Sequence, residues 1–338
     1  MDTFELLRQL CEQDFVGGLQ DAAGTVAQLL RPYVDQVERL PDGSVLGRLG
    51  DDGPGTLLEA HIDQVGLVVT QVYDDGFLSV AKCGGPDIRA LPAASVTIHG
   101  RKNLPGVFYS TPPHLRKRED DALPELDKLY IDTGLGKQAK ELIAPGDYVT
   151  YDTCPVLLKN GMVSARSLDD RAACAALILA AQQLHKQPPA GRVLFAFCSG
   201  EELGSRGAIT TAFAAEANRA VAVDVSFGQS PGVPEHRCGV LGKGPMIGVS
   251  PVLSGRVTAG LQAVCEERQI TCQTEVMGGS TSTDADVIAL SKQGIACGLV
   301  SIPLRYMHTP VECVQLRDVE LTAILLAEYV RKAGQEDD

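Results

Sequence analysis

The sequence lacks the features that mark membrane, secreted and disulfide-bonded proteins. No apolar run reaches the roughly 18 residues that a membrane-spanning helix needs. The first residues do not form a signal peptide, and none of the ten cysteines falls in a Cys-x-x-Cys pair. We therefore expect a cytoplasmic protein whose cysteines are free thiols.

Positive charge is also scarce. The chain has 30 Lys and Arg residues against 43 Asp and Glu residues, which gives a net charge of −13. Because nucleic acids and anionic membranes attract basic surfaces, this balance argues against both as partners. At 338 residues the chain is longer than a usual single domain, so we expect one large domain and a smaller one.

Histidine is scarce as well, yet two of the six histidines lie at the ends of apolar runs that are typical of strands. In α/β proteins the strands present functional groups at the edge where they end. This shared placement predicts a two-metal hydrolase site. Five short groups of possible metal ligands occupy such positions: His61 with Asp63, Asp169 with Asp170, Glu201 with Glu202, Asp224, and His308.

The first group, His61 and Asp63, follows the strand-like run 56–60, in which Leu57, Leu58 and Ala60 are apolar. Residues two apart in a strand share a face, so both side chains are expected to point into one cavity. His61 suits a divalent metal as a neutral imidazole, and Asp63 is spaced to orient the ligands or the catalytic base. Taken alone, this motif is also consistent with a polar pair at a strand end.

Two groups pair adjacent carboxylates. Asp169 and Asp170 precede an Ala- and Leu-rich segment, so they could be metal ligands or simply cap a buried helix. Glu201 and Glu202 follow the expected strand 192–198, and adjacent side chains leaving a strand diverge. One glutamate could therefore bind a metal while the other accepts the proton of a water molecule.

The last two groups complete a plausible ligand set. Asp224 follows four apolar residues, where an unpaired carboxylate would be costly to bury unless a metal offset its charge. A lone histidine such as His308 is more often structural, but it supplies a nitrogen ligand for a second metal. Two imidazoles and three carboxylates suit Zn or a similar ion.

The pattern of apolar residues divides the chain into three parts. Segments 1–70 and 162–338 show helix and strand patterns that indicate one discontinuous catalytic α/β domain, whereas 71–161 has little helical periodicity and reads as an inserted β domain. Helices are expected at about 4–13, 20–38, 170–185, 202–216, 254–268, 282–293 and 316–333. Strands are expected near 192–198, 220–225, 271–277 and 295–300.

Five ordered motifs resemble those of the TET metalloaminopeptidases, which assemble into tetrahedral dodecamers and include glutamyl, leucyl and lysyl aminopeptidases. The resemblance runs almost from end to end. It implies a three-layer α/β/α catalytic domain with an inserted small β-barrel-like domain. The motifs are His61 to Gly66, Ser167 to Arg171, Glu201 to Gly204 with Gly207 and Ala208, Asp224 with Val225, and Ile302 to Glu312.

The resemblance also implies a role for each site residue. Asp169 bridges two metals, of which one is bound by His61 and Asp224 and the other by Glu202 and His308. Glu201 is the general base, Asp63 holds His61, and Asp170 follows Asp169 across a peptide bond that is often cis in such enzymes. Thr283 and Asp284 lie in the loop 278–284, which is expected to contact the substrate.

The implied function is a metal-dependent aminopeptidase that releases N-terminal amino acids from short peptides. Two divalent ions, Zn in the first instance with Co or Mn as possibilities, activate a water molecule and Glu201 takes its proton. Another dinuclear-metal amidohydrolase, of the aminoacylase or deacetylase type, could use the same ligands. A catalytically inactive assembly protein would be expected to lack a ligand or the base, and none is missing.

Self-association is expected from the resemblance and from the apolar content of the inserted segment. The likeness implies a dodecamer built from dimers. The insertion at 71–161 is expected to form part of the subunit contacts, since exposed apolar patches usually mark interfaces. A monomer whose insertion packs on the catalytic domain is the alternative. The apolar residues concerned are Val107, Phe108, Tyr109, Leu129, Tyr130 and Ile131.

Overall fold

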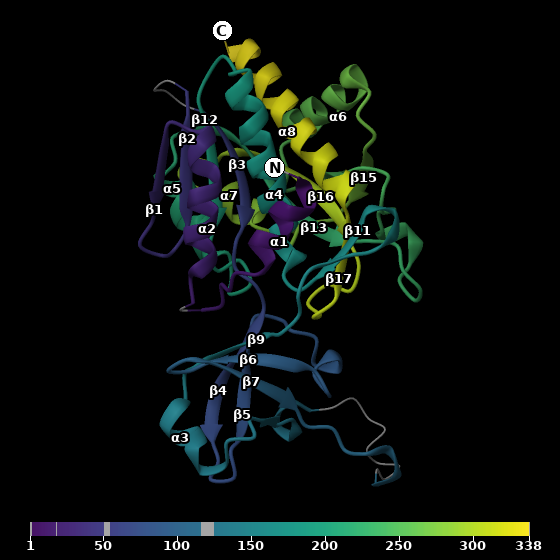
Figure 1. The fold of residues 1–338 in the computed structure, drawn as a ribbon. Coiled ribbons are helices and arrows are strands. Elements are labelled where there is room, and N and C mark those ends of the chain that lie inside the picture. Colours follow the sequence, from purple (N-terminus) through teal and green to yellow (C-terminus); the bar gives the residue numbers. More distant parts are fainter. Residues whose placement is uncertain (1, 18, 51–54, 116–124, 338) are drawn as a thin grey trace.

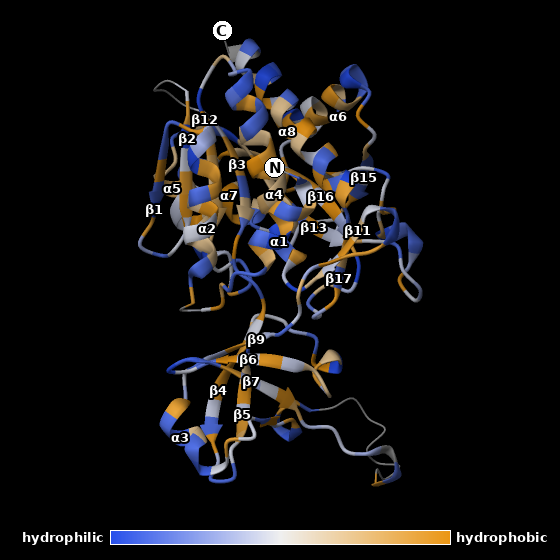
Figure 2. Ribbon diagram, in the orientation of Figure 1, coloured by the Kyte–Doolittle hydropathy of each residue, from blue (hydrophilic) through white to orange (hydrophobic). Residues whose placement is uncertain are grey.

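The computed structural model describes residues 2–17, 19–50, 55–115 and 125–337. Figure 1 shows a larger body of helices and strands above a smaller body built mainly of strands. In Figure 2 the strands of the smaller body are largely apolar, while the outer ends of the helices α4, α6 and α8 are largely polar. Each body therefore encloses its own apolar interior.

An eight-stranded sheet forms the centre of the larger body. The strands β3, β12, β13 and β16 run parallel to one another, so their carboxyl ends meet at one edge. In spatial order the strands are β1 (Gln36–Arg39), β2 (Val45–Leu49), β12 (Val193–Cys198), β3 (Gly55–His61), β13 (Ala217–Phe227), β16 (Ala296–Leu304), β14 (Met246–Val249) and β15 (Gln273–Val276).

Helices cover both faces of this sheet, which confirms the predicted three-layer α/β/α architecture. Alternate residues of the strands point to opposite faces, so Leu58 packs under one helical layer and Leu57 under the other. The first layer contains α1 (Thr3–Cys11), α2 (Asp21–Leu30), α4 (Leu168–Lys186), α6 (Gly255–Arg268) and α8 (Leu316–Asp337). The second contains α5 (Arg206–Ala214) and α7 (Ala285–Ile288).

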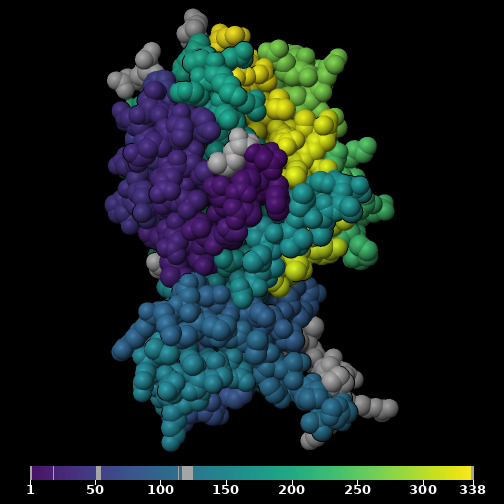
Figure 3. All heavy atoms as spheres, in the orientation of Figure 1, coloured from purple at the N-terminus to yellow at the C-terminus, as the bar shows by residue number. Residues whose placement is uncertain are grey.

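The two ends of the chain meet in the first helical layer. In Figure 3 the purple N-terminal residues lie against the yellow C-terminal helix on the face shown. The Thr3 hydroxyl donates a hydrogen bond to Glu320 over 2.7 Å, which joins α1 to α8. No helix in the described part of the chain is long and apolar enough to cross a membrane.

The smaller body is a closed six-stranded barrel, so the predicted β-barrel-like insertion is confirmed. Its core contains Ile98, Phe108, Ile131 and Val149. The strands in order are β4 (Gly66–Val72), β5 (Phe77–Cys83), β8 (Ile131–Asp132), β7 (Asn103–Phe108), β6 (Ser95–His99) and β9 (Tyr148–Tyr151), with the short helix α3 (Ala139–Leu142) at its side. The division of the chain at residues 70 and 161 stays a prediction.

The barrel buries more of its apolar residues than the sequence analysis expected. Phe108, Leu129 and Ile131 lie in the barrel core and are at most 6% exposed. Among the six residues named as excess, Val107 and Tyr109 are the clearly exposed ones, at 49% and 43%. The argument that the insertion could not bury these side chains alone is therefore wrong for half of them.

A small three-stranded sheet links the barrel to the site. It consists of β10 (Val156–Leu157), β11 (Met162–Ala165) and β17 (Glu312–Gln315). The antiparallel pairing of β11 with β17 sets Ala165 opposite Glu312. Since β11 leads directly into Asp169, this sheet fixes the start of α4 against the segment that follows His308.

Several predicted elements differ in extent from the observed ones. The helix expected at 20–38 ends at Leu30, because Pro32 cannot donate a helical hydrogen bond, and 36–39 forms an edge strand instead. The helix expected at 282–293 is reduced to α7, and α5 begins at Arg206 because 200–205 forms the turn that carries Glu201. The strand β14 was not predicted, since four residues give too little periodicity.

Candidate metal centre

The parallel strands deliver the predicted ligands to one place. His61 ends β3, Asp224 lies in β13, and His308 follows β16. The turn after β12 carries Glu201 and Glu202, and Asp169 enters from the start of α4. A cavity of about 470 Å³ is lined by all six of these ionisable side chains: His61, Asp169, Glu201, Glu202, Asp224 and His308.

Asp169 lies between the two histidines. One carboxylate oxygen is 3.1 Å from Nε2 of His61, and the other is 3.4 Å from Nε2 of His308. His308 Nε2 also lies 3.3 Å from Glu202 Oε1, while His61 Nε2 lies 3.9 Å from Asp224 Oδ1. This is the arrangement expected of a carboxylate shared by two metal sites.

Two groups of possible ligands emerge from the geometry of this cavity. Within each group the ligand atoms all lie within 4.8 Å of one another. One group consists of His61, Asp170 and Asp224, and the other of Asp169, Glu202 and His308. Asp170 was predicted only as the neighbour of the bridging residue, and the structure places it close enough to be considered as a ligand itself.

The buried carboxylates and imidazoles of this centre have shifted pKa values. Burial disfavours the ionised form of Asp169, yet hydrogen bonds with His308 and His61 hold its pKa below the usual range. Burial likewise opposes protonation of His308, but hydrogen bonds to Asp169 and Glu202 raise its pKa to about 11. Burial raises the pKa of Asp224. Histidine and carboxylate side chains are ligands of divalent ions. Such an ion would displace the protons that the raised pKa values of His308 and Asp224 favour.

Asp63 holds three parts of the centre in position. Its side chain is buried and accepts the backbone N–H of Glu201 over 3.0 Å and that of Glu202 over 3.2 Å. One of its oxygens also lies 3.5 Å from Nδ1 of His61. Asp63 therefore orients an imidazole and both glutamates, which agrees with the supporting role suggested by its spacing.

Glu201 has the environment of a general base. It lines the cavity, and burial raises its pKa to about 7. A base with a pKa close to the working pH combines a usable fraction of the ionised form with a strong drive to accept a proton.

Glu312 is a supporting residue to which the sequence analysis gave no role. It is buried, and its two oxygens accept the backbone N–H of His308 over 2.7 Å and that of Asp169 over 3.0 Å. It thereby fixes two possible ligands that are far apart in the sequence. Its position four residues after His308 was visible, but its contact with Asp169 depends on the pairing of β11 with β17.

The start of α4 has an unusual backbone and a buried charge. The peptide bond between Asp169 and Asp170 is cis, as the resemblance implied. Asp170 is fully buried and accepts the N–H of Ala173 over 3.2 Å. The Arg171 guanidinium is also fully buried and has no hydrogen-bond partner in the described part of the chain.

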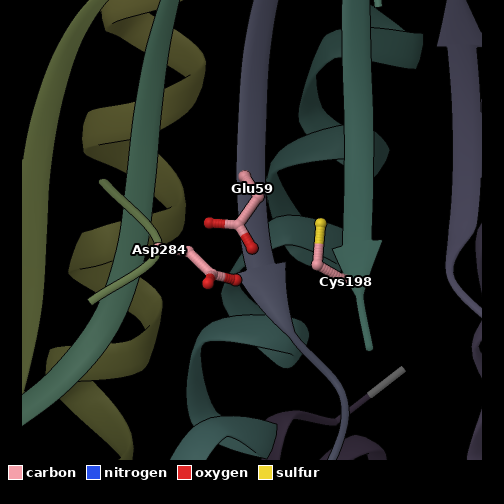
Figure 4. Close-up of side chains that lie close together, drawn as sticks. All are labelled: Glu59, Cys198 and Asp284. Atoms are coloured by element: carbon pink, nitrogen blue, oxygen red, sulfur yellow. The ribbon is translucent and has the colours of Figure 1, made fainter. Parts of the chain in front are cut away.

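The two predicted substrate contacts behave differently. Thr283 lines the cavity, and its contact with substrate stays a prediction. Asp284 is not among the lining residues; it is only 3% exposed, and its side chain lies beside that of Glu59 (Figure 4). Asp284 is therefore withdrawn as a substrate contact.

Glu59, Asp284 and Cys198 form a separate buried group, and none of the three lines the cavity. Figure 4 shows Glu59 on β3 between the other two side chains. Burial and the neighbouring charge of Asp284 raise the pKa of Glu59 well above its usual range. This acid lies on the strand face otherwise packed by Leu57 and Ala196, and the sequence analysis assigned it no role.

A family model and a curated relative match most of the chain. Residues 43–325 match the model of a family described as M42 glutamyl aminopeptidase. The chain is 30% identical to a lysyl aminopeptidase of Pyrococcus furiosus over 335 residues, which cover 95% of each protein. Both findings agree with the resemblance drawn from the five motifs.

Solved structures give the same result. An aminopeptidase from the archaeon Desulfurococcus kamchatkensis superimposes with a TM-score of 0.91 at 31% identity, covering 98% of this chain and 94% of that one. The TET1 peptidase of Pyrococcus horikoshii, described as able to assemble into a tetrahedron or a large octahedral shell, has a TM-score of 0.87 at 29% identity. That match covers 97% of this chain and 99% of the other.

Proposed function

The chain belongs to the M42 glutamyl aminopeptidase family and is a metal-dependent aminopeptidase, and we propose that it removes N-terminal residues from short peptides in the cavity at the carboxyl edge of its sheet. The observation that supports this most strongly is Asp169 lying between two imidazoles, with Glu201 lining the same cavity. The acidic wall of the cavity favours a positively charged N-terminus over a blocked one.

Two divalent ions would be held by residues of this chain. His61 and Asp224 would bind one, Glu202 and His308 the other, and Asp169 both, with Asp170 as a further candidate beside His61. Zn suits this mixture of nitrogen and oxygen donors, and Co or Mn could replace it. Such ions supply an activated water molecule and polarise the scissile carbonyl.

The remaining chemistry falls to the side chains. Glu201 accepts a proton from water and returns it to the leaving amine, a role that fits its pKa of about 7. Asp63 keeps Glu201 aligned through the backbone hydrogen bond described above, and Glu312 keeps Asp169 and His308 in place. Thr283 remains the candidate for contact with the substrate backbone or side chain.

The activity can be tested directly. Aminoacyl p-nitroanilides should be hydrolysed after addition of Zn, Co or Mn to metal-free protein, and their N-acetylated counterparts should not. Release of acetate from N-acetylated amino acids, without release of p-nitroaniline from the unblocked compounds, would instead support the alternative, an aminoacylase or deacetylase with the same ligands. Absence of hydrolysis with every metal would contradict the proposed function.

We also propose that the chain self-associates, as a dodecamer built from dimers, with the barrel forming part of the contacts. The support comes from the relatives' assemblies and from the exposed Val107 and Tyr109 on the barrel. Light scattering on metal-loaded protein tests this. A mass near that of one subunit at micromolar concentrations would contradict it, and a cytoplasmic location stays a separate prediction.

A further inference from the structure

The cavity continues beyond the metal ligands to another carboxylate. Glu275 of β15 lines its wall and is hydrogen-bonded to Ser226 of β13 and Ser301 of β16. Around it lie side chains that no step of the hydrolysis uses. They are Ser226, Phe227, Met277, Leu299, Ser301 and Met307.

Two hydroxyl groups hold the Glu275 carboxylate in a fixed orientation. The Ser301 hydroxyl donates to Glu275 Oε2 over 2.7 Å, and the Ser226 hydroxyl donates to the other oxygen. Ser301 is only 1% exposed and is paired in register with Asp224 of the neighbouring strand. The carboxylate is therefore tied to the strand position beside a proposed metal ligand.

Among the described residues, no Lys or Arg side chain pairs with this carboxylate. Over the described ranges, the cavity lining contains no Lys or Arg. Its hydrogen-bond donors are neutral hydroxyls, which orient the carboxylate but leave its negative charge in place. A half-buried charge of this kind favours a cationic partner from outside the chain.

Apolar side chains also line this cavity. Met277 and Met307 line the same cavity as Glu275 and offer thioether and alkyl surface. Lys and Arg side chains combine an apolar stem with a terminal cation, so the stem would contact these residues while the cation reaches Glu275. An acidic side chain would meet Glu275 and the carboxylates of the metal centre and be repelled.

We propose that Glu275 is a specificity-determining residue that selects peptides with an N-terminal Lys or Arg. This inference rests on the proposed aminopeptidase function. It predicts the order lysyl and arginyl first, neutral side chains of similar length next, and glutamyl last. Norleucine, which has a neutral chain similar in length to that of lysine, is the matched comparison.

The first experiment measures kcat/KM for lysyl and norleucyl p-nitroanilide in wild type and in Glu275→Gln. A charge-assisted hydrogen bond to the substrate predicts that the lysyl-to-norleucyl ratio falls by about 10–100-fold in the variant. Glu266→Gln, which changes an exposed glutamate on α6, is the control and should leave the ratio unchanged. An unchanged ratio in Glu275→Gln would overturn the inference.

A binding experiment separates this inference from the proposed function. Titration calorimetry with metal-loaded Glu201→Gln protein compares the dipeptides Lys-Ala and norleucyl-Ala, so that no hydrolysis is required. Tighter binding of Lys-Ala, lost when Glu275→Gln is added, supports the inference even if the wild type proves inactive. Equal affinity for the two dipeptides contradicts it even if the wild type hydrolyses peptides.

Discussion

The two bodies of this protein differ in the side chains that they bury. The barrel core is formed by apolar residues such as Ile98, Phe108 and Ile131, and its strands close into a ring without an open edge. The α/β body buries carboxylates at the end of its sheet, among them Asp169 and Asp224. Because unpaired buried charge destabilises a fold, the α/β body should depend on bound cations, whereas the barrel should not.

The largest expected effect of a single substitution is at the base. Glu201→Gln should lower kcat by about 10²–10⁴-fold, the usual contribution of a general base, while metal content stays near that of the wild type. Glu202→Gln should instead weaken one metal site. Kinetics combined with elemental analysis measure both, and identical behaviour of the two variants would show that the assignment within the glutamate pair is wrong.

Removal of metal should affect the two bodies unequally. Chelation leaves the buried carboxylates without cations, so the melting temperature should fall and the assembly should loosen. Hydrogen exchange should accelerate around β3 and α4, while β6 and β9 of the barrel keep their protection. Equal acceleration of hydrogen exchange in both bodies, or an unchanged melting curve in metal-free protein, would contradict the claim that only the α/β body depends on bound cations.

The stability of the metal-free protein should depend on pH through the buried groups of the α/β body. Burial raises the pKa of Glu201 from 4.5 in the unfolded chain to about 7 in the folded protein. Between these two pH values the folded state keeps a proton that the unfolded state has lost. The free energy of unfolding therefore falls as the pH rises from 4.5 to about 7. His308, with a pKa raised to about 11, also contributes stability that is lost as the pH rises. Melting of chelated protein should therefore occur at lower temperature at about pH 8 than at about pH 5.

Two measurements test whether the melting temperature falls between about pH 5 and about pH 8 for this reason. In the Glu201→Gln variant without metal, the decrease in melting temperature between the two pH values should be smaller. In metal-loaded wild type it should be reduced or reversed, because ligands bind metal more tightly once their protons are lost. A metal-free protein that becomes more stable toward pH 8 would contradict the assignment of these charges.

The smallest expected effect on the metal centre comes from the barrel. Ile131→Ala removes a fully buried side chain and should destabilise the protein by about 2–5 kcal/mol. Metal affinity per folded subunit should nevertheless stay unchanged, because Ile131 belongs to the separate barrel core. Denaturant unfolding and metal titration measure the two quantities, and a matching loss of metal affinity would show that the bodies are coupled.

The sequence predicted the site better where a strand carried the ligand. His61 ends β3, Asp224 lies near the end of β13 and His308 follows β16, and the apolar residues that precede each of them made these strands visible. Short elements were less visible, as the missed strand β14 and the shortened α7 illustrate. Their conformation is determined by packing against neighbours more than by local pattern.

Residues that act through tertiary contacts could not be predicted from local sequence. Glu312 contacts Asp169 only because β17 pairs with β11, and Glu275 meets Ser301 across two sheet positions. Asp284 shows the converse, since a polar residue in a glycine-rich loop was expected at the cavity and is instead buried beside Glu59. Each case depends on the pairing of segments that are distant in the chain.

The most direct test of the account is the number of metal ions bound by Asp169→Asn. The proposed bridging role predicts that metal-free wild type takes up two divalent ions per subunit and that this variant loses high-affinity binding of both, whereas Glu202→Gln loses one. Titration calorimetry with Zn, checked by elemental analysis after gel filtration, measures the stoichiometry. Two tightly bound ions per subunit in Asp169→Asn would contradict a centre built around Asp169.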